Sequence, residues 1–301
     1  MRNIGKVMLV ATALITSLGL VGCVNEPQTE LTPAKQACIE TMQKVPVYYE
    51  DFEFWDVAAL RNDPDMADMY HVWYERKAQF IEENYGLSSS SIEYLAQGEG
   101  LLDIIKVDYD IDAVRDKIAA DYYRDMDYED TEVWRSEPSH DPQSVTGGWV
   151  LAEGQIVRGA NNSNIDDYLK VARGDELSMY DANAAALLDR LPEGIMTRIS
   201  RSGYPEGLIL SGSSITKEEK NVLRWTNIYE FESAEDVRSA DAEKYFQGIE
   251  DGFKEAENIF AERGEDSFFN ISGFTIKYDG EFVTWSLLLN EQYMIALLFY
   301  G

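Results

Sequence analysis

Three aspartates at alternate positions, Asp108, Asp110 and Asp112, form the most suggestive cluster of ligand-type side chains in the sequence. In a calcium-binding loop, this spacing supplies successive oxygen ligands. Such a loop also needs a glycine and a bidentate glutamate, where Ala113 and Ala119 stand instead. The aspartates lie between a strand pattern and a helix pattern, where a carboxylate caps the positive end of the helix. We therefore predict a helix cap here and no metal site.

A second pattern with chemical potential joins Ser214 and Lys217, which match the serine–lysine spacing of penicillin-recognising enzymes. Neither of the two companion motifs of those enzymes follows, and Thr216 with Glu219 fits a helix capping box. The sequence also lacks a Gly-x-Ser-x-Gly elbow, a phosphate loop, a dinucleotide fingerprint and a His-Glu-x-x-His motif. We assign no catalytic residue and no cofactor.

The histidines and one cysteine offer little further chemistry. His71 lies beside the apolar face of a predicted helix, His140 lies in a polar loop, and surface positions are expected for both. Two histidines in separate elements argue against a histidine-rich metal site. Cys38 opens an amphipathic stretch far from either histidine, so we expect a small buried side chain and not a nucleophile.

Tryptophan and tyrosine are abundant, with 6 and 18 residues, and could build a stacking surface for sugars or peptides. Trp149, Trp225 and Trp285 lie inside strand patterns, however, so packing in the core is the expected role of all three.

Composition limits the classes of partner. The chain has 301 residues with 55 acidic against 26 basic side chains, a formal net charge of −29. Such a surface repels phosphate backbones, so nucleic acid is not expected as a partner. The apolar content of 45% is enough for a substantial core.

The hydrophobic periodicity predicts an α+β fold, an antiparallel sheet or sheets with amphipathic helices packed on one face. Helices are expected over residues 65–85, where Lys77 interrupts the apolar stripe, and over residues 239–263. Two further helices are expected over residues 110–125 and over residues 162–174, the second with Gly174 as its stop. Asp279-Gly280 predicts the turn of a hairpin. The segments that begin at Tyr49 and Tyr229 each lead from a strand into a long helix, which suggests two related halves, although similar strand-to-helix junctions would give the same pattern.

Residues 108–194 resemble, through "DIDAVRDKI", "GQIVRG" and "LPEG", uncharacterised exported bacterial proteins built from strand, helix and hairpin units. That resemblance implies no known activity and supplies no catalytic residue.

The N-terminus has the features of an export signal: a positive start, the apolar run Val7–Leu20, and then Leu20-Val21-Gly22-Cys23. This run is too short to be a comfortable membrane span. The last four residues resemble the lipobox of bacterial lipoproteins. The resemblance implies that residues 1–22 are removed as a signal peptide and that Cys23 receives the lipid. An ordinary secreted protein cut at a nearby small residue is the alternative.

Four segments are expected from these patterns: the signal peptide 1–22, a lipidated tether 23–42, a first α+β half 43–205 and a second half 206–301. The two halves would also be compatible with one continuous domain.

The expected function is that of a membrane-anchored extracytoplasmic module that binds a ligand or an envelope protein. It would be held by its lipid to the outer face of the cytoplasmic membrane, or to the outer membrane if the cell has one. The alternative is an extracytoplasmic hydrolase that uses a pair of carboxylates. Two buried carboxylates facing each other in one cleft would favour the hydrolase. A transporter's solute-binding lipoprotein fits poorly, because such proteins use repeated parallel strand–helix units.

Overall fold

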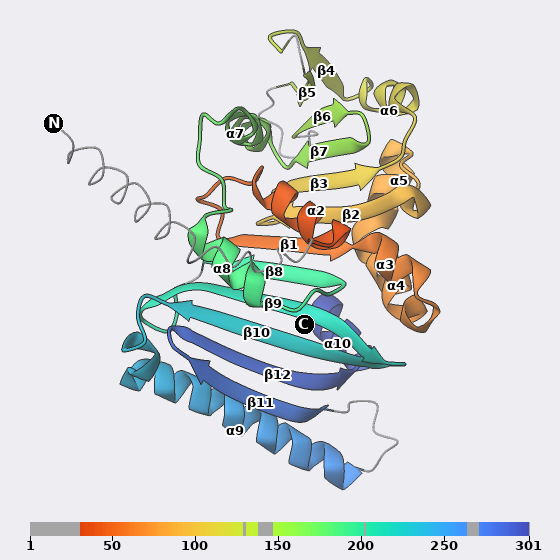
Figure 1. Cartoon of the computed structure of the whole chain (residues 1–301). Coiled ribbons are helices and arrows are strands. Elements are labelled where there is room, and N and C mark those ends of the chain that lie inside the picture. Colours follow the sequence, from red (N-terminus) through yellow and green to blue (C-terminus); the bar gives the residue numbers. More distant parts are fainter. Residues whose placement is uncertain (1–30, 129–130, 138–146, 202, 264–270, 301) are drawn as a thin grey trace, which may run out of the picture. The chain divides into compact units, whose positions relative to one another are not determined.

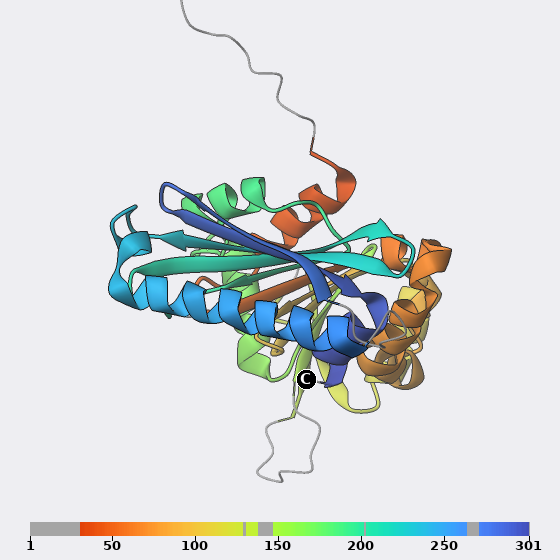
Figure 2. The ribbon, with the colours of Figure 1, turned by 90° about the horizontal axis from the view of Figure 1, so that it is seen from below.

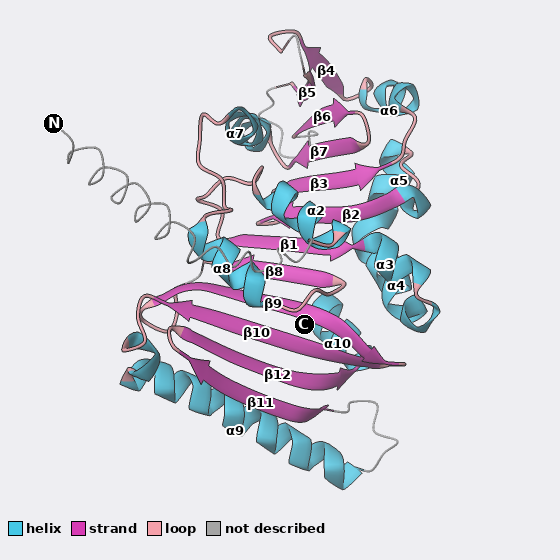
Figure 3. Cartoon of the chain, viewed as in Figure 1, coloured by secondary structure: helices cyan, strands magenta, loops and turns pink. Residues whose placement is uncertain are grey.

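The computed structural model describes residues 31–128, 131–137, 147–201, 203–263 and 271–300. Within these residues, twelve strands form a single sheet in the order β11-β12-β10-β9-β8-β1-β2-β3-β7-β6-β5-β4 (Figures 1 and 3). Every pair of neighbouring strands is antiparallel. The predicted α+β class with an antiparallel sheet is confirmed.

The strands are β1 (Asp51–Asp56), β2 (Ile92–Gly98), β3 (Leu102–Val107), β4 (Tyr122–Asp125), β5 (Glu132–Ser136), β6 (Gly148–Ala152), β7 (Gln155–Gly159), β8 (Met196–Ser200), β9 (Leu208–Glu219), β10 (Val222–Phe231), β11 (Ile271–Asp279) and β12 (Phe282–Asn290). The helices are α2 (Pro33–Met42), α3 (Val57–Asn62), α4 (Ala67–Trp73), α5 (Gln79–Tyr85), α6 (Ile111–Ile118), α7 (Asn162–Arg173), α8 (Ala182–Arg190), α9 (Ala240–Arg263) and α10 (Glu291–Tyr300). None of the described helices is both long and apolar enough to cross a membrane.

Helices cover both faces of the sheet, whereas the hydrophobic periodicity predicts helices on one face (Figure 2). One core packs α2, α7 and α8 against what we call the back face. The other packs α3 to α6, α9 and α10 against what we call the front face. The central strand β3 shows the physical reason, because five of its six residues are buried. A strand in the middle of a large sheet with apolar residues on both sides needs cover on both sides.

Two features of the structure bear on the predicted segments. The described residues from Ala34 on form one compact unit, and β8 and β9 pair across the expected division between residues 205 and 206, an arrangement compatible with the alternative of one continuous domain. The predicted tether overlaps α2, whose Ala37, Cys38, Ile39 and Met42 are buried, so the folded unit begins earlier than residue 43. The predicted signal peptide 1–22 and Cys23 lie outside the described residues.

The helix predicted over residues 65–85 is present but is interrupted by a π-helical turn, Tyr74–Ala78, between α4 and α5. Lys77 lies in this turn, at the point where it breaks the apolar stripe in the sequence. The extra residue of a π-helical turn re-aims nearby side chains, and such turns are frequent at functional sites.

Two other local predictions are wrong. The helix expected to continue to Asp125 ends at Ile118, and Tyr122–Asp125 form the edge strand β4. The capping box expected at Thr216 and Glu219 does not form, because both residues belong to the long strand β9. In both places, pairing with a neighbouring strand overrides the local signal for a helix.

A buried carboxylate joins the last helix to α4. Glu291 is 3% exposed, and its Oε1 accepts a hydrogen bond from the Met69 backbone N–H at 3.1 Å. Burial raises the pKa of Glu291, and the nearby carboxylates Asp68, Asp63 and Asp65 raise it further, against the effect of the Met69 hydrogen bond. The folded protein therefore disfavours the ionised form of this side chain.

We expect Glu291→Gln to be more stable than the wild type near pH 8. Because the folded pKa is raised, the wild type loses stability as the pH rises through that pKa, whereas Gln carries no charge and can still accept from Met69. Denaturant midpoints at pH 8 and near pH 4 measure the difference, which should disappear at the lower pH. Glu255→Gln, on the exposed side of α9, is the control and should change stability by at most about 0.5 kcal/mol. Equal midpoints for wild type and Glu291→Gln at pH 8 would contradict the prediction.

Candidate functional site

A row of polar side chains crosses the front face of the sheet at right angles to the strands. Each member lies directly opposite the next in the strand register, over seven neighbouring strands. This polar row consists, from β7 to β10, of Arg158, Asp103, Gln97, Glu53, Arg198, Ser213 and Asn227. Such an alignment is assembled by tertiary pairing alone, since its members come from positions 53 to 227.

One step further along the strands, on the same face, lies an apolar row of Ile156, Ile105, Leu95, Trp55, Met196, Ile215, Trp225 and Leu287. Helix α10 covers part of this row, with the Phe299 ring stacked on Trp55 at a centroid distance of 5.7 Å. The apolar row therefore belongs to the core, and the polar row lies beside it.

The β7 to β1 part of the polar row is tightly hydrogen-bonded. The Arg158 guanidinium donates to Asp103 at 3.1 Å, and the Gln97 amide donates to the other oxygen of Asp103 at 2.7 Å. Lys77 donates both to Gln97 Oε1 at 2.6 Å and to Glu53 Oε1 at 3.1 Å. The π-helical turn that carries Lys77 thus connects two strands of the row. Positioned charges that hold each other in place give a site fixed geometry.

Glu53 and Asp51 are also held from the sides. The Trp55 indole N–H donates to Glu53 Oε1 at 2.6 Å. On the neighbouring strand, the Arg198 guanidinium lies 3.2 Å from Asp51 Oδ2, and half of the Arg198 side chain remains exposed. Arg198 therefore keeps donors available to solvent or to a bound molecule.

Two adjoining hollows open over this region of the front face, and Arg198 lines both of them. The first has a volume of about 700 Å³ and is lined by Glu50, Asp51, Glu53, Lys77, Gln97, Glu99, Gly100 and Arg198. The second has a volume of about 180 Å³ and is lined by Arg198, Ser200, Ser211, Gly212, Ser213, Trp225 and Asn227. Together we call them the polar groove. Its volume lies in the range of about 300–1,000 Å³ that is usual for small-molecule sites.

Three polar atoms of the groove have no hydrogen-bond partner among the described residues. They are Asp51 Oδ1, Asn227 Nδ2 and Trp225 Nε1, and all three are shielded from bulk solvent. A buried polar atom left unsatisfied costs about 1–3 kcal/mol. Trp225 therefore differs from its expected role, since it lines the groove as well as contacting Trp285 at a ring distance of 5.3 Å. The cost is recovered when a bound molecule or a water supplies the partner.

The groove also has an unusual backbone at its rim. Glu99, in the turn between β2 and β3, has a φ of +49°, a left-handed conformation that non-glycine residues rarely adopt. Its carboxylate accepts the Glu50 backbone N–H at 2.5 Å. Strained positions of this type are concentrated at functional sites.

The residues singled out from the sequence lie elsewhere. Asp110 caps α6 by accepting the Asp112 and Ala113 backbone N–H groups at 3.0 and 3.3 Å, which confirms the capping interpretation. Asp112 pairs with Arg115 at 2.6 Å. No group of three or more potential ligands suited to a metal ion occurs within the residues that the structure describes.

The serine–lysine pair does not meet. Ser214 is fully buried, and Lys217 donates to Asp63 at 2.7 Å and to Asp65 at 2.8 Å. Three residues apart on one strand, the two side chains point to opposite faces of the sheet. The pair therefore cannot act as a nucleophile and its base.

The remaining candidates have the expected positions where they are described. His71 is exposed on α4 beside Glu75 at 3.3 Å, whereas His140 lies outside the described residues. Cys38 is 3% exposed, and burial raises the pKa of its thiol to about 12, which keeps it protonated and unreactive. Trp149 and Trp285 are buried in the core.

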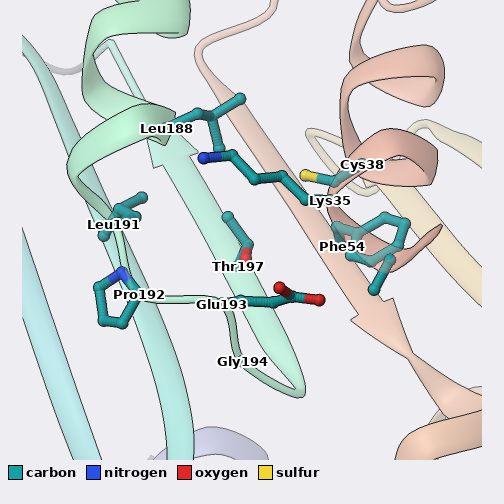
Figure 4. Close-up of a pocket in the computed structure, with 10 residues that line it drawn as sticks. Lys35, Cys38, Phe54, Leu188, Leu191, Pro192, Glu193, Gly194 and Thr197 are labelled. Atoms are coloured by element: carbon teal, nitrogen blue, oxygen red, sulfur yellow. The ribbon is translucent and has the colours of Figure 1, made fainter. Parts of the chain in front are cut away.

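A separate apolar notch lies on the back face between α2 and α8 (Figure 4). Lys35 and Cys38 of α2 face Leu188 of α8, with Thr197 of β8 and Phe54 of β1 below them. The cavity volume is only about 20 Å³. That is room for about one water molecule, too small for a small-molecule ligand.

The carboxylate arrangement bears on the hydrolase alternative. Among the described residues, the buried carboxylates are Asp103, Glu230 and Glu291. Asp103 belongs to the polar row, Glu230 is in β10 on the back face, and Glu291 begins α10, so no two of them face each other in one cleft. Burial raises the pKa of Asp56, Glu230 and Glu291, and each lies outside the polar groove. A general acid for glycoside hydrolysis needs a raised pKa at the site of reaction.

No family model, no curated protein and no solved structure matches the chain. The chemistry of the groove itself is therefore the basis for a functional proposal.

Proposed function

We propose that the protein is a membrane-anchored extracytoplasmic lipoprotein, lipidated at Cys23, that binds a polar small molecule in the polar groove. The observation that carries the binding role is the polar row with its open groove. Seven strands align their polar side chains at one level, and three of the groove's polar atoms lack partners among the residues that the structure describes. The lipobox pattern supports the anchor, with the membrane reached through the lipid alone.

Binding without catalysis is the role that the groove chemistry supports. The Glu53 carboxylate accepts a hydrogen bond from Lys77 and the Asp51 carboxylate pairs with Arg198, so both are held in place as acceptors. The lining is rich in hydroxyl, amide and charged groups, so the ligand should be polar along most of its length.

A thermal-shift screen with the detergent-solubilised full chain tests the binding role. The library contains neutral sugars, amino sugars, amino acids, polyamines and short peptides. At a ligand concentration of 100 times its Kd, binding adds about 2.7 kcal/mol of stability, which gives a measurable rise in Tm. We expect at least one class to stabilise the protein, and Arg198→Ala to abolish that shift.

The matched control for this screen is Arg224→Ala. Arg224 is also in a strand and is paired with a carboxylate, Glu218, at 2.6 Å, but its position in β10 places its side chain on the back face. This variant should keep the ligand-dependent shift. If no compound stabilises the wild type, or if both arginine variants respond alike, the groove is not the binding site.

A further inference from the structure

The two hollows of the polar groove differ in charge and hydrogen-bonding character. The first hollow has four carboxylates, Glu50, Asp51, Glu53 and Glu99, against the two cations Lys77 and Arg198. Glu53 and Asp51 have cationic partners, but Asp51 retains one oxygen without a partner. The net negative charge of this end favours a ligand with a positive group.

The second hollow has no acidic side chain. Ser200, Ser211 and Ser213 line it with hydroxyl groups, and Asn227 and Trp225 add N–H donors that have no partner among the described residues. Hydroxyl groups both donate and accept, whereas amide and indole N–H groups need an acceptor. A ligand with several hydroxyl groups satisfies all of these at once.

Neighbouring residues in the strand register connect the acidic hollow with the hydroxyl-lined hollow. Asp51 lies opposite Ser200, and Ser200 lies opposite Ser211, in three consecutive strands. With strands about 4.8 Å apart, the distance from β1 to β10 across the groove is about 14 Å. This is long enough for more than one sugar ring in an extended chain.

We infer that the groove binds a saccharide that carries a free ammonium group. The ammonium lies at the Asp51 and Glu99 end, and the ring hydroxyls lie against the serines, Asn227 and Trp225. This inference rests on the groove being the binding site, and it adds the class of ligand. A peptide fits less well, because the lining offers its apolar side chains little besides Trp225 to pack against.

Isothermal titration of the solubilised full chain with matched oligosaccharides provides the test. The glucosamine disaccharide with free amines is compared with its N-acetylated form and with cellobiose, and spermidine supplies charge without hydroxyl groups. We expect the free-amine disaccharide to bind about tenfold more tightly than the other three, a difference of about 1.4 kcal/mol. The preference should weaken as salt rises, because exposed charges are screened.

Two isosteric variants separate the ends of the groove. Asp51→Asn should reduce affinity for the free-amine disaccharide about tenfold and leave cellobiose unchanged. Ser213→Ala should weaken all three saccharides together. The control is Asp279→Asn. Asp279 is an exposed carboxylate at the end of β11 that pairs with Arg190, and its substitution should change the affinity for neither the free-amine disaccharide nor cellobiose.

The outcomes of these titrations test the ligand class separately from the proposal that the groove is the binding site. Equal affinity for the amine and its acetylated form would overturn the ammonium assignment, and equal affinity for spermidine would overturn the saccharide. In either case the groove remains the binding site if Arg198→Ala still abolishes binding. If amino acids or peptides alone bind, and do so through Arg198, the ligand class is wrong and the proposed function stands.

Discussion

Cys23→Ala will abolish lipid attachment and release the protein from the membrane fraction. Cys38→Ala will keep its lipid and stay in the membrane fraction. The sequence contains only these two cysteines, and Cys38 is buried with a thiol that is protonated at physiological pH. Two acyl chains at about 0.8 kcal/mol per buried methylene hold a protein stably at a bilayer, so their loss changes the distribution almost completely.

The measurement is incorporation of an alkyne palmitate into the full chain in bacterial cells, together with fractionation. Intact mass should show the wild type shortened by residues 1–22 and the Cys23→Ala chain retaining them. If Cys23→Ala were labelled to the same level as the wild type, the proposed anchor would be overturned. If only Cys38→Ala lost the label, the modified residue would be Cys38 in the folded unit, which would contradict the buried position of that thiol.

Gly194→Ala will destabilise the protein by about 3 kcal/mol or more, the upper end of the cost of overpacking a well-filled site. A Cβ at position 194 would lie 2.1 Å from the Ile215 carbonyl oxygen and 2.8 Å from its carbon. The next residue, Ile195, donates its N–H to the same carbonyl at 2.9 Å, so the two segments cannot separate without losing this hydrogen bond. Because the clash is with backbone, no change of rotamer relieves it.

Gly252→Ala is the matched control for this substitution. Gly252 lies within α9, and a Cβ there meets nothing within 4 Å. Alanine in a helix interior is more stable than glycine by about 0.5–1 kcal/mol, so this variant should be stabilised. Urea midpoints of the two variants measure the contrast, and a neutral Gly194→Ala would show that the chain at Gly194 does not approach β9 this closely.

The sequence predicted local structure well where local chemistry determines it. The cap at Asp110, the stop at Gly174 and the hairpin at Asp279-Gly280 all depend on a few adjacent residues, and all three form. Helical periodicity likewise located α9, which begins at Ala240, one residue from its expected start. Helix α10 and strand β4 depend on packing and edge pairing, which the local sequence does not contain.

The polar groove could not be predicted from the sequence, because the register between distant strands creates it. Gln97 and Arg198 are separated by about a hundred residues in the chain, and each lies opposite Glu53 only because β1 pairs with both β2 and β8. A shift of one residue in either pairing would turn one set of side chains to the other face. The sequence contains a weak signal at Glu53, which lies between the two apolar residues Phe52 and Phe54 of β1. Lys77, which interrupts an otherwise regular stripe, was the clearest sign.

Helix α2 determines how a tethered molecule would present itself to its surroundings. The chain enters the folded unit through α2, which packs on the back face, whereas the groove opens on the front face. A lipid attached upstream of α2 would therefore join the folded unit on the face of the sheet opposite to the groove. The linker would then not have to cross the groove opening, and a long polymeric glycan could lie along the groove without meeting it.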